Sequence, residues 1–222
     1  MAWFTEDFEV FFKELSENNN RDWFLENKKR YEKSVKQPFQ AFVADMILRM
    51  QKYDDQCRIE PKDAIFRINR DIRFSKDKTP YKTQVSAVIG RGGKKEMALT
   101  GMYLELGSGH ARVYGGVYMP TKEQLQGIRQ EILYNQKEFE NLISDKTFVK
   151  YFIEMRGEKN KRLPSEFAEI QIEQPLIANK QFYYYSNLEP KIITSDSLID
   201  EMFKRFEASL AIRQFLHAPL ND

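Results

Sequence analysis

The sequence predicts an α+β fold in which a central antiparallel sheet of four or more strands is covered by helices from both ends of the chain. Two changes of hydrophobic period support this prediction. Apolar residues follow helical spacing in residues 1–52, alternate with polar residues within residues 64–119, and return to helical spacing in residues 121–217. With 222 residues, 41% of them hydrophobic, the chain can bury a substantial core, so we interpret residues 1–222 as a single domain.

Three helices are predicted before residue 52. The first follows a Thr5 cap, and the second runs from about Arg21 to Val35 behind an Asn20 cap. Pro38 then either breaks the helical pattern or opens the third helix, since proline is tolerated in a first turn. One stripe of the third helix, typical of a face packed in the core, consists of Phe39, Phe42, Val43, Met46, Ile47 and Met50.

The middle of the chain is predicted to form strands. In the stretch FRINRDIRF the apolar residues all carry even numbers, which is the period of two expected of a half-buried strand. The stretch GRGG, residues 90–93, is typical of a hairpin turn, and the short links imply an antiparallel meander. The predicted strands cover residues 66–74, 83–90, 97–107 and 111–119, with a further candidate at residues 181–188.

Helical spacing returns after Pro120. Thr121 and Gln124 have the spacing of a capping box, which predicts the start of a helix. Two shorter helical pieces are predicted near residues 139–143 and 148–153, and the last helix covers about residues 196–216 behind a Ser195 cap.

Several classes of site are disfavoured by the sequence. Cys57 is the only cysteine, so an intrachain disulfide or a multi-cysteine zinc site is excluded. His110 and His217 lie far apart and belong to no compact metal-binding motif, so we expect no metal site, and no motif indicates a particular cofactor. The sequence has no apolar run of membrane-spanning length and no signal-peptide pattern at its start. We therefore expect a soluble, cytoplasmic protein without a membrane partner.

The stretch FRINRDIRFSKDKTPYKT, residues 66–83, carries six basic and two acidic side chains, although the formal charge of the whole chain is only +2. In a strand, Arg70 shares the apolar face with Ile68 and Ile72. A buried guanidinium is costly without a partner, so we expect Arg70 to form a structural ion pair, for which Glu105 on a neighbouring strand is a candidate.

The opposite face of this strand and the loop that follows it form the predicted ligand-binding site. On that face Arg67 and Arg73 can clamp an anion with bidentate hydrogen bonds, while the loop lysines add point charges and Tyr81 offers a ring for stacking. We interpret the site as one for a phosphate-bearing ligand, either a small molecule or nucleic acid. The predicted ligand-binding residues are Arg67, Asn69, Asp71, Arg73, Ser75, Lys76, Lys78, Tyr81 and Lys82.

Two alternatives from other functional classes remain open. The same clamp would serve a phosphoester-processing enzyme in which Asp71 acts as a metal ligand or a base. Alternatively, the basic stretch is an ion-pair network in a structural or interaction protein that has no small-molecule site.

Several segments together resemble a known family. They are NNNRDWFLENKKRYE, FRINRDIRFSKDKTPYKT, YLEL, and GGVYMP before a helix that reads LQGIRQEI. They resemble a family of bacterial and fungal proteins known only as a domain of unknown function, and the resemblance extends from about Phe11 to Phe167. One element departs from the family pattern, since KRLPSEF stands here in place of LKRxPKGF. The resemblance implies no particular activity, cofactor or catalytic residue.

Overall fold

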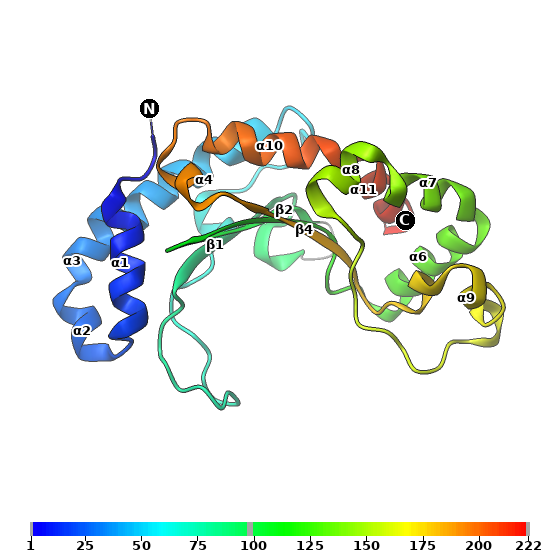
Figure 1. Cartoon of the computed structure of the whole chain (residues 1–222), viewed down its shortest axis with the longest axis horizontal. Helices are drawn as coiled ribbons and strands as arrows, with labels where there is room; N and C mark the ends of the chain where they lie inside the picture. The colour runs from blue at the N-terminus through cyan, green and yellow to red at the C-terminus, as the bar shows by residue number, and fades with distance from the viewer. Residues whose placement is uncertain (1, 97–99, 221–222) are drawn as a thin grey trace.

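The protein is built on one four-stranded antiparallel sheet with the strand order β1-β2-β3-β4. The computed structural model describes residues 2–96 and 100–220. Strands β1 (Gln84–Gly90), β2 (Thr100–Gly107) and β3 (His110–Val117) form a meander, and β4 (Phe182–Leu188) returns after a long helical segment to pair with β3. Helices from both ends of the chain pack around this sheet, which confirms the predicted α+β class (Figure 1).

The N-terminal helices form one lobe of the molecule. They are α1 (Glu6–Glu17), α2 (Arg21–Glu26), α3 (Lys28–Tyr31), the π-helical turn η1 (Glu32–Lys36), α4 (Gln37–Met50) and α5 (Pro61–Ala64). The Asn20 cap is confirmed, because its side-chain oxygen accepts a hydrogen bond from the Trp23 amide. The helix expected from Arg21 to Val35 is interrupted at Asn27 and then continues through η1 into α4, with Pro38 in the first turn of α4.

The segments that follow β3 form the second lobe. Its helices are α6 (Lys122–Tyr134), α7 (Gln136–Ser144), α8 (Lys146–Phe152), α9 (Ile170–Glu173), α10 (Leu198–Ala208) and α11 (Leu210–His217), of which α10 extends back over the first lobe (Figure 1). The predicted capping box of α6 is formed by Thr121 and Gln124. The single last helix expected from the sequence is two helices, because the chain breaks at Ser209.

Short 3₁₀ turns connect these elements: η2 (Gly93–Lys95), η4 (Ser165–Phe167), η5 (Pro175–Ala178), η6 (Pro190–Thr194) and η7 (Ala218–Leu220). The first of them lies between β1 and β2, where the sequence predicted a plain hairpin turn. The predicted start of the next strand, residues 97–99, lies outside the described residues, and β2 begins at Thr100.

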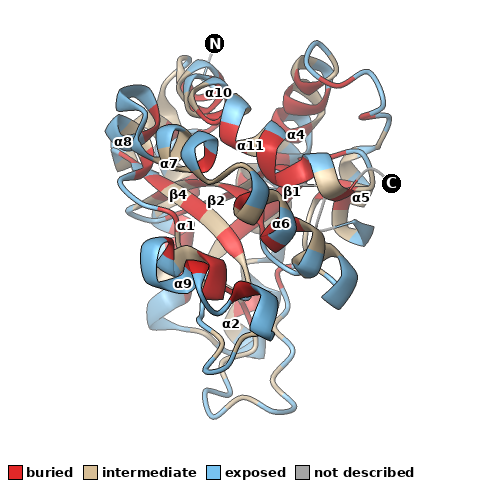
Figure 2. Ribbon diagram, turned by 90° about the vertical axis from the view of Figure 1, so that its right-hand side faces the viewer, coloured by how far each residue is buried: buried red, intermediate tan, exposed pale blue. Residues whose placement is uncertain are grey.

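The buried side chains form two hydrophobic clusters. Figure 2 marks the buried residues of the strands and helices in red. The first lies between α1, α4, α10 and the sheet, and the second lies between α6, α7, α8, α11 and the sheet. Strand β3 contributes Val113 to the first cluster and Val117 to the second, while β4 contributes Leu188 to the first and Phe182 to the second. Strands β3 and β4 therefore connect both clusters.

The strand predicted at residues 66–74 is absent, and this part of the sequence interpretation was wrong. The chain instead leaves the sheet after α5, forms a long excursion and returns at β1 (Figure 1). Within the excursion the two legs pair at one isolated bridge, between Asn69 and Tyr81. Of its alternating apolar residues Ile68 is buried, but Phe74 is 96% exposed, so no second layer supports a strand here. We call residues 66–83 the basic loop.

Among the described residues, no helix has the length and apolar character required to cross a bilayer.

Candidate ligand-binding site on the open face of the sheet

Tyrosines from three strands lie side by side on the sheet face opposite the buried aliphatic residues. Tyr103 of β2 pairs in register with Tyr114 of β3, which pairs with Tyr185 of β4. The ring centroids are 5.3 Å apart between the first two and 5.4 Å apart between the second two. Because successive side chains of a strand point to opposite faces, the neighbouring Leu104 and Val113 enter the core while the tyrosines face away from it.

A cavity of about 460 Å³ opens beside this row of tyrosines. Its lining combines aromatic rings, two glycines at the end of β3 and two charged side chains: Phe66, Lys82, Tyr103, Glu105, Tyr114, Gly115, Gly116, Tyr118 and Tyr183. Gly116 has φ +94°, and a Cβ atom there would lie 2.1 Å from the Phe182 carbonyl oxygen, so the backbone at this point requires glycine. The volume is in the range of small-molecule sites.

Glu105 is the fixed carboxylate of the cavity. Its oxygens accept hydrogen bonds from the Tyr103 hydroxyl at 2.8 Å and the Tyr114 hydroxyl at 3.1 Å, and His110 Nε2 lies 2.9 Å from Oε2. Burial raises the pKa of Glu105, but the hydrogen bonds from His110, Tyr103 and Tyr114 outweigh it, so the pKa lies below its usual value. The carboxylate is therefore ionised at neutral pH.

The two tyrosines beside Glu105 remain protonated. The pKa of Tyr114 is raised to about 12, and the pKa of Tyr103 is raised as well. Burial is the largest cause for both residues. Because both hydroxyl protons are directed to Glu105, these residues offer a ligand mainly the faces and edges of their rings.

Lys82 brings a positive charge to the cavity without a carboxylate partner. Its Nζ lies 5.4 Å from the centroid of the Phe66 ring, and it forms no ion pair with any acid in the described part of the chain. Burial lowers the pKa of Lys82, the nearby charge of Arg67 lowers it further, and Glu105 opposes both. Arg67 is exposed and likewise forms no ion pair with a described residue. Lys82 thus lines the cavity with Arg67 nearby, and neither side chain forms an ion pair with a described carboxylate.

Two further arginines lie over the last tyrosine of the row. The guanidinium carbons of Arg112 and Arg156 are each 4.7 Å from the centroid of the Tyr185 ring. Arg156 pairs with Glu154 at 2.8 Å, whereas Arg112 donates to the Asn187 side-chain oxygen at 2.7 Å and to the Tyr114 hydroxyl at 2.9 Å. Positive charge therefore extends from the rim of the cavity across the sheet.

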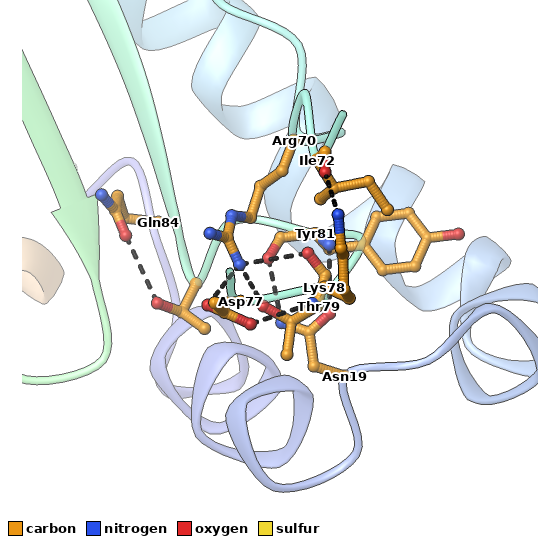
Figure 3. A network of polar contacts seen from close by, with 9 residues as sticks. Asn19, Arg70, Ile72, Asp77, Lys78, Thr79, Tyr81 and Gln84 are labelled. Atoms are coloured by element: carbon orange, nitrogen blue, oxygen red, sulfur yellow. Dashed lines mark hydrogen bonds and ion pairs between the residues drawn. The ribbon is translucent and has the colours of Figure 1, made fainter. Parts of the chain in front are cut away.

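Arg70 is not the partner of Glu105. Its guanidinium donates to Asp77 Oδ2 at 2.5 Å and to the Thr79 carbonyl oxygen at 3.1 Å, all within the basic loop (Figure 3). The expected ion pair between Arg70 and Glu105 required residues 66–74 to lie in the sheet beside β2. Since this segment leaves the sheet, Arg70 finds an acid close in sequence instead.

The predicted binding residues at the far end of the basic loop lie outside the cavity lining. Arg73 and Asp71 form a bidentate pair with N–O distances of 2.9 and 2.7 Å, and these bonds hold the pKa of Asp71 below its usual value. Lys78 Nζ donates to the Ile72 carbonyl oxygen at 2.9 Å. Two more predicted residues lie nearby: Ser75 is half-buried and Lys76 is exposed.

Tyr81 was predicted to stack on a ligand, but its ring is packed against the protein. It is 7% exposed and stacks on Phe24 with a centroid distance of 4.0 Å. Asn69 forms the isolated bridge to Tyr81 and is exposed. Of the nine predicted binding residues, the structure therefore places Lys82 in the cavity lining. Arg67 lies close enough for its charge to lower the pKa of Lys82.

Comparison with known families shows to which family the chain belongs. The model of the conserved hypothetical protein family DUF2461 matches residues 7–215. The chain belongs to the DUF2461 family. This match confirms the family resemblance that the sequence motifs indicated. Neither a curated protein nor a solved structure shows significant similarity to this DUF2461 protein.

The sequence interpretation missed the aromatic half of the candidate site in this DUF2461 protein. Tyr103, Tyr114, Tyr183 and Tyr185 occupy positions of β2, β3 and β4 that alternate with core residues. Such positions are usually polar when they face solvent, so bulky rings at several of them were a signal for a binding face. In the described ranges of the DUF2461 chain, no group of three His, Cys, Asp or Glu side chains is placed to hold a metal ion.

Proposed function

We propose that the protein binds a phosphate-bearing ligand with a planar ring, a nucleotide unit either free or within a nucleic acid, in the cavity on the open face of the sheet. The observation that carries this proposal is Lys82, a half-buried ammonium group without a carboxylate partner at the rim of a cavity lined by aromatic rings.

The charge of Lys82 supports an anionic ligand. Removing an ammonium group partly from water is unfavourable unless an opposite charge compensates it. The fixed anion of the cavity, Glu105, is already engaged by two tyrosines and His110. A phosphate group at the rim would instead bring negative charge to Lys82 and to the exposed Arg67 together.

The aromatic lining supports a planar ring in the rest of the ligand. Phe66, Tyr103, Tyr114, Tyr118 and Tyr183 surround the cavity, and the Tyr118 side chain is 52% exposed. Stacking of a base on an aromatic side chain contributes about 1–3 kcal/mol and tolerates different bases. The ligand would then be oriented by its phosphate and held by its ring.

The far end of the basic loop would act only on a longer ligand. Arg73, Lys76 and Lys78 lie outside the cavity lining, so a single nucleotide in the cavity has no need of them. A nucleic acid would extend from the cavity along the loop and contact these residues through successive phosphates. Asp71 is engaged by Arg73 and also lies outside the cavity lining, so we do not assign it a catalytic role.

We also propose a cytoplasmic location. Its support is Cys57, the one cysteine of the sequence and a buried free thiol, so the fold uses no intrachain disulfide of the kind common in oxidising compartments.

The test is a calorimetric titration with adenosine 5′-monophosphate, adenosine and a single-stranded deoxyadenosine oligomer. We expect the monophosphate to bind and adenosine to bind at least about tenfold more weakly, because a charge-assisted hydrogen bond is lost. Lys82→Ala should weaken monophosphate binding by a similar factor. Lys137→Ala, which removes an exposed lysine of α7 that forms no ion pair in the described chain, is the matched control.

The oligomer distinguishes the two sources of the nucleotide unit. If nucleic acid is the ligand, the oligomer binds more tightly than the monophosphate and its affinity falls more steeply with salt, by counterion release. Lys78→Ala then weakens only the oligomer. Equal affinities indicate a free nucleotide. If the folded parent binds none of the three at low salt, the proposal is wrong.

A further inference from the structure

A second cavity, of about 300 Å³, lies in the C-terminal lobe and shares no lining residue with the first. It is formed by the first two turns of α6 and by the segment that leads into η4. Its lining residues are Lys122, Leu125, Gln126, Arg129, Asn160, Pro164 and Phe167. Two of these residues are basic and none is acidic.

Arg129 is the unusual member of this lining. It is only 5% exposed, and its Nε and Nη2 atoms donate to the carbonyl oxygens of Ile177 and Asn179 at 2.9 and 3.1 Å. Its Nη1 atom donates to no group in residues 2–96 or 100–220, and no carboxylate of those ranges forms an ion pair with it. The two carbonyl groups satisfy two donors but do not neutralise the charge.

The guanidinium group of Arg129 does not become neutral by losing its proton. Burial lowers the pKa of Arg129, yet arginine remains charged in proteins at any physiological pH. A buried charge is normally paired, and pairing here requires an anion. The cavity is the place beside Arg129 where an anion can enter.

The other lining residues define what kind of anion fits. Lys122 is exposed and forms no ion pair within the described chain, so its ammonium group can contact the same ligand. Leu125, Pro164 and Phe167 supply an apolar wall. Glu166, which is not part of the lining, accepts a long hydrogen bond of 3.5 Å from the Gln126 amide.

We propose that this cavity binds a small organic anion, whose carboxylate or phosphate group contacts Arg129 Nη1 and Lys122 Nζ and whose apolar part packs against Leu125 and Phe167. The site is independent of the nucleotide site, because the two cavities have separate linings and lie on different elements.

The experiment is an NMR titration that follows the Arg129 Nε–Hε signal and the Leu125 methyl groups. The probes are benzoate for a carboxylate, phenyl phosphate for a phosphate, and benzyl alcohol as the uncharged counterpart. We expect saturable shifts of both groups with at least one anion and none with benzyl alcohol. The probe that binds more tightly identifies the acid group that the site prefers.

Variants assign the binding to the named residues. Lys122→Ala should weaken binding about two- to fivefold, the range expected for a partly exposed charge pair. Arg129→Met should weaken it at least about tenfold. Lys137→Ala and Lys82→Ala, which lie outside this cavity, should leave it unchanged. If Arg129→Met does not fold, the two Lys122 variants test the proposal. We then expect Lys122→Glu to bind the anion more weakly than Lys122→Ala does.

Three outcomes would overturn the proposal. The first is the absence of saturable shifts with both anions, and the second is equal shifts with benzyl alcohol. The third is anion binding that is unchanged in both Lys122→Ala and Lys122→Glu. In each case Arg129 serves only to hold η5 against α6 through the two carbonyl groups.

Discussion

The Tyr81 ring stacks on the Phe24 ring with a centroid distance of 4.0 Å and an angle of 16° between the ring planes. The backbone of Tyr81 is bonded in both directions to the Asn19 side chain, through its amide at 3.1 Å and its carbonyl oxygen at 2.9 Å. The returning leg of the basic loop is thereby fixed to α2, and the next residue, Lys82, enters the cavity. Packing on one lobe thus positions a charge at the site.

Replacement of Tyr81 tests this anchoring. Because the ring is buried, Tyr81→Ala should lower the free energy of unfolding by about 3 kcal/mol, in the range for deletion of a buried aromatic side chain. It should also weaken nucleotide binding, since Lys82 loses its support. Tyr81→Phe keeps the stacked ring and should stay within about 0.5 kcal/mol of the parent. Urea denaturation measures both variants, and a Tyr81→Ala protein as stable as the parent would contradict the anchoring role.

Asp77 provides a pH-dependent test of the basic loop. Hydrogen bonds from the Thr79 amide, then from Arg70 and the Thr79 hydroxyl, lower the pKa of Asp77 from 3.8 to about 2. Because the folded pKa is depressed, the stabilisation of the loop is complete above the unfolded pKa of 3.8 and is lost as pH falls through about 2.

The expected result is an NMR titration of the Asp77 carboxyl carbon with a midpoint near pH 2. Arg70→Met should move this midpoint toward the ordinary value but not fully, because the amide of Thr79 still donates at 2.9 Å. Arg73→Met is the control and should leave the midpoint unchanged, since Arg73 pairs with Asp71. An unchanged midpoint in Arg70→Met would show that the Arg70 pair does not form in solution.

Local sequence patterns predicted the helices well because the signals are local. The Asn20 cap, the Thr121 capping box and the apolar stripe after Pro38 each depend on residues within a few positions of one another. The same reasoning failed at residues 66–74, where alternation describes spacing but not the presence of a neighbouring strand. The side chains of Asp71 and Asp77 bond to loop groups nearby, which competes with a regular ladder.

The site could be predicted only in part for a related reason. Lys82 was found because basic residues cluster in the sequence. The row formed by Tyr103, Tyr114 and Tyr185 depends on the register between β3 and β4, which are separated by the whole helical segment from α6 to η5. No local pattern contains this register. We expected a buried guanidinium group at Arg70, but the structure buries Arg129 instead. Arg129 lies in the helix predicted after Thr121, and the sequence interpretation did not single it out.

The single domain expected from the sequence stays a prediction, and two core substitutions test it. Phe39 lies in the first hydrophobic cluster and Phe139 in the second. If β3 and β4 couple the clusters into one cooperative unit, Phe39→Ala and Phe139→Ala each lower the stability of the whole chain, by about 3–5 kcal/mol. Trp3 and Trp23 both pack against the first cluster, so their fluorescence reports on it alone.

The decisive variant is Phe139→Ala, followed in urea by tryptophan fluorescence and by far-ultraviolet circular dichroism. We expect both signals to shift together to lower urea concentration. A tryptophan transition that remains at the parent midpoint, while circular dichroism shows an earlier step, would divide the chain into two folding units.

Replacement of Lys82 by methionine should stabilise the unbound protein while it removes ligand binding. The ammonium group is half-buried without a carboxylate partner, and a site residue is often retained at a cost in stability. Methionine keeps a contact with Phe66, because sulfur–aromatic and cation–aromatic contacts have similar magnitudes. Since solvent screens the half-exposed charge, we expect a gain of only roughly 0.5 kcal/mol at pH 7.

The pH dependence gives this prediction a second readout. The folded pKa of Lys82 lies below 10.5, so the unfolded chain binds this proton more tightly than the folded chain does. The stability of the parent should therefore gain a component as pH rises through the folded pKa toward 10.5, and Lys82→Met should lack that component. Lys137→Met, at an exposed position, is the control for both readouts. A Lys82→Met protein less stable than the parent by more than about 1 kcal/mol would contradict the prediction, and would show that the contacts of the ammonium group with the Phe66 ring and the charge of Glu105 are net stabilising.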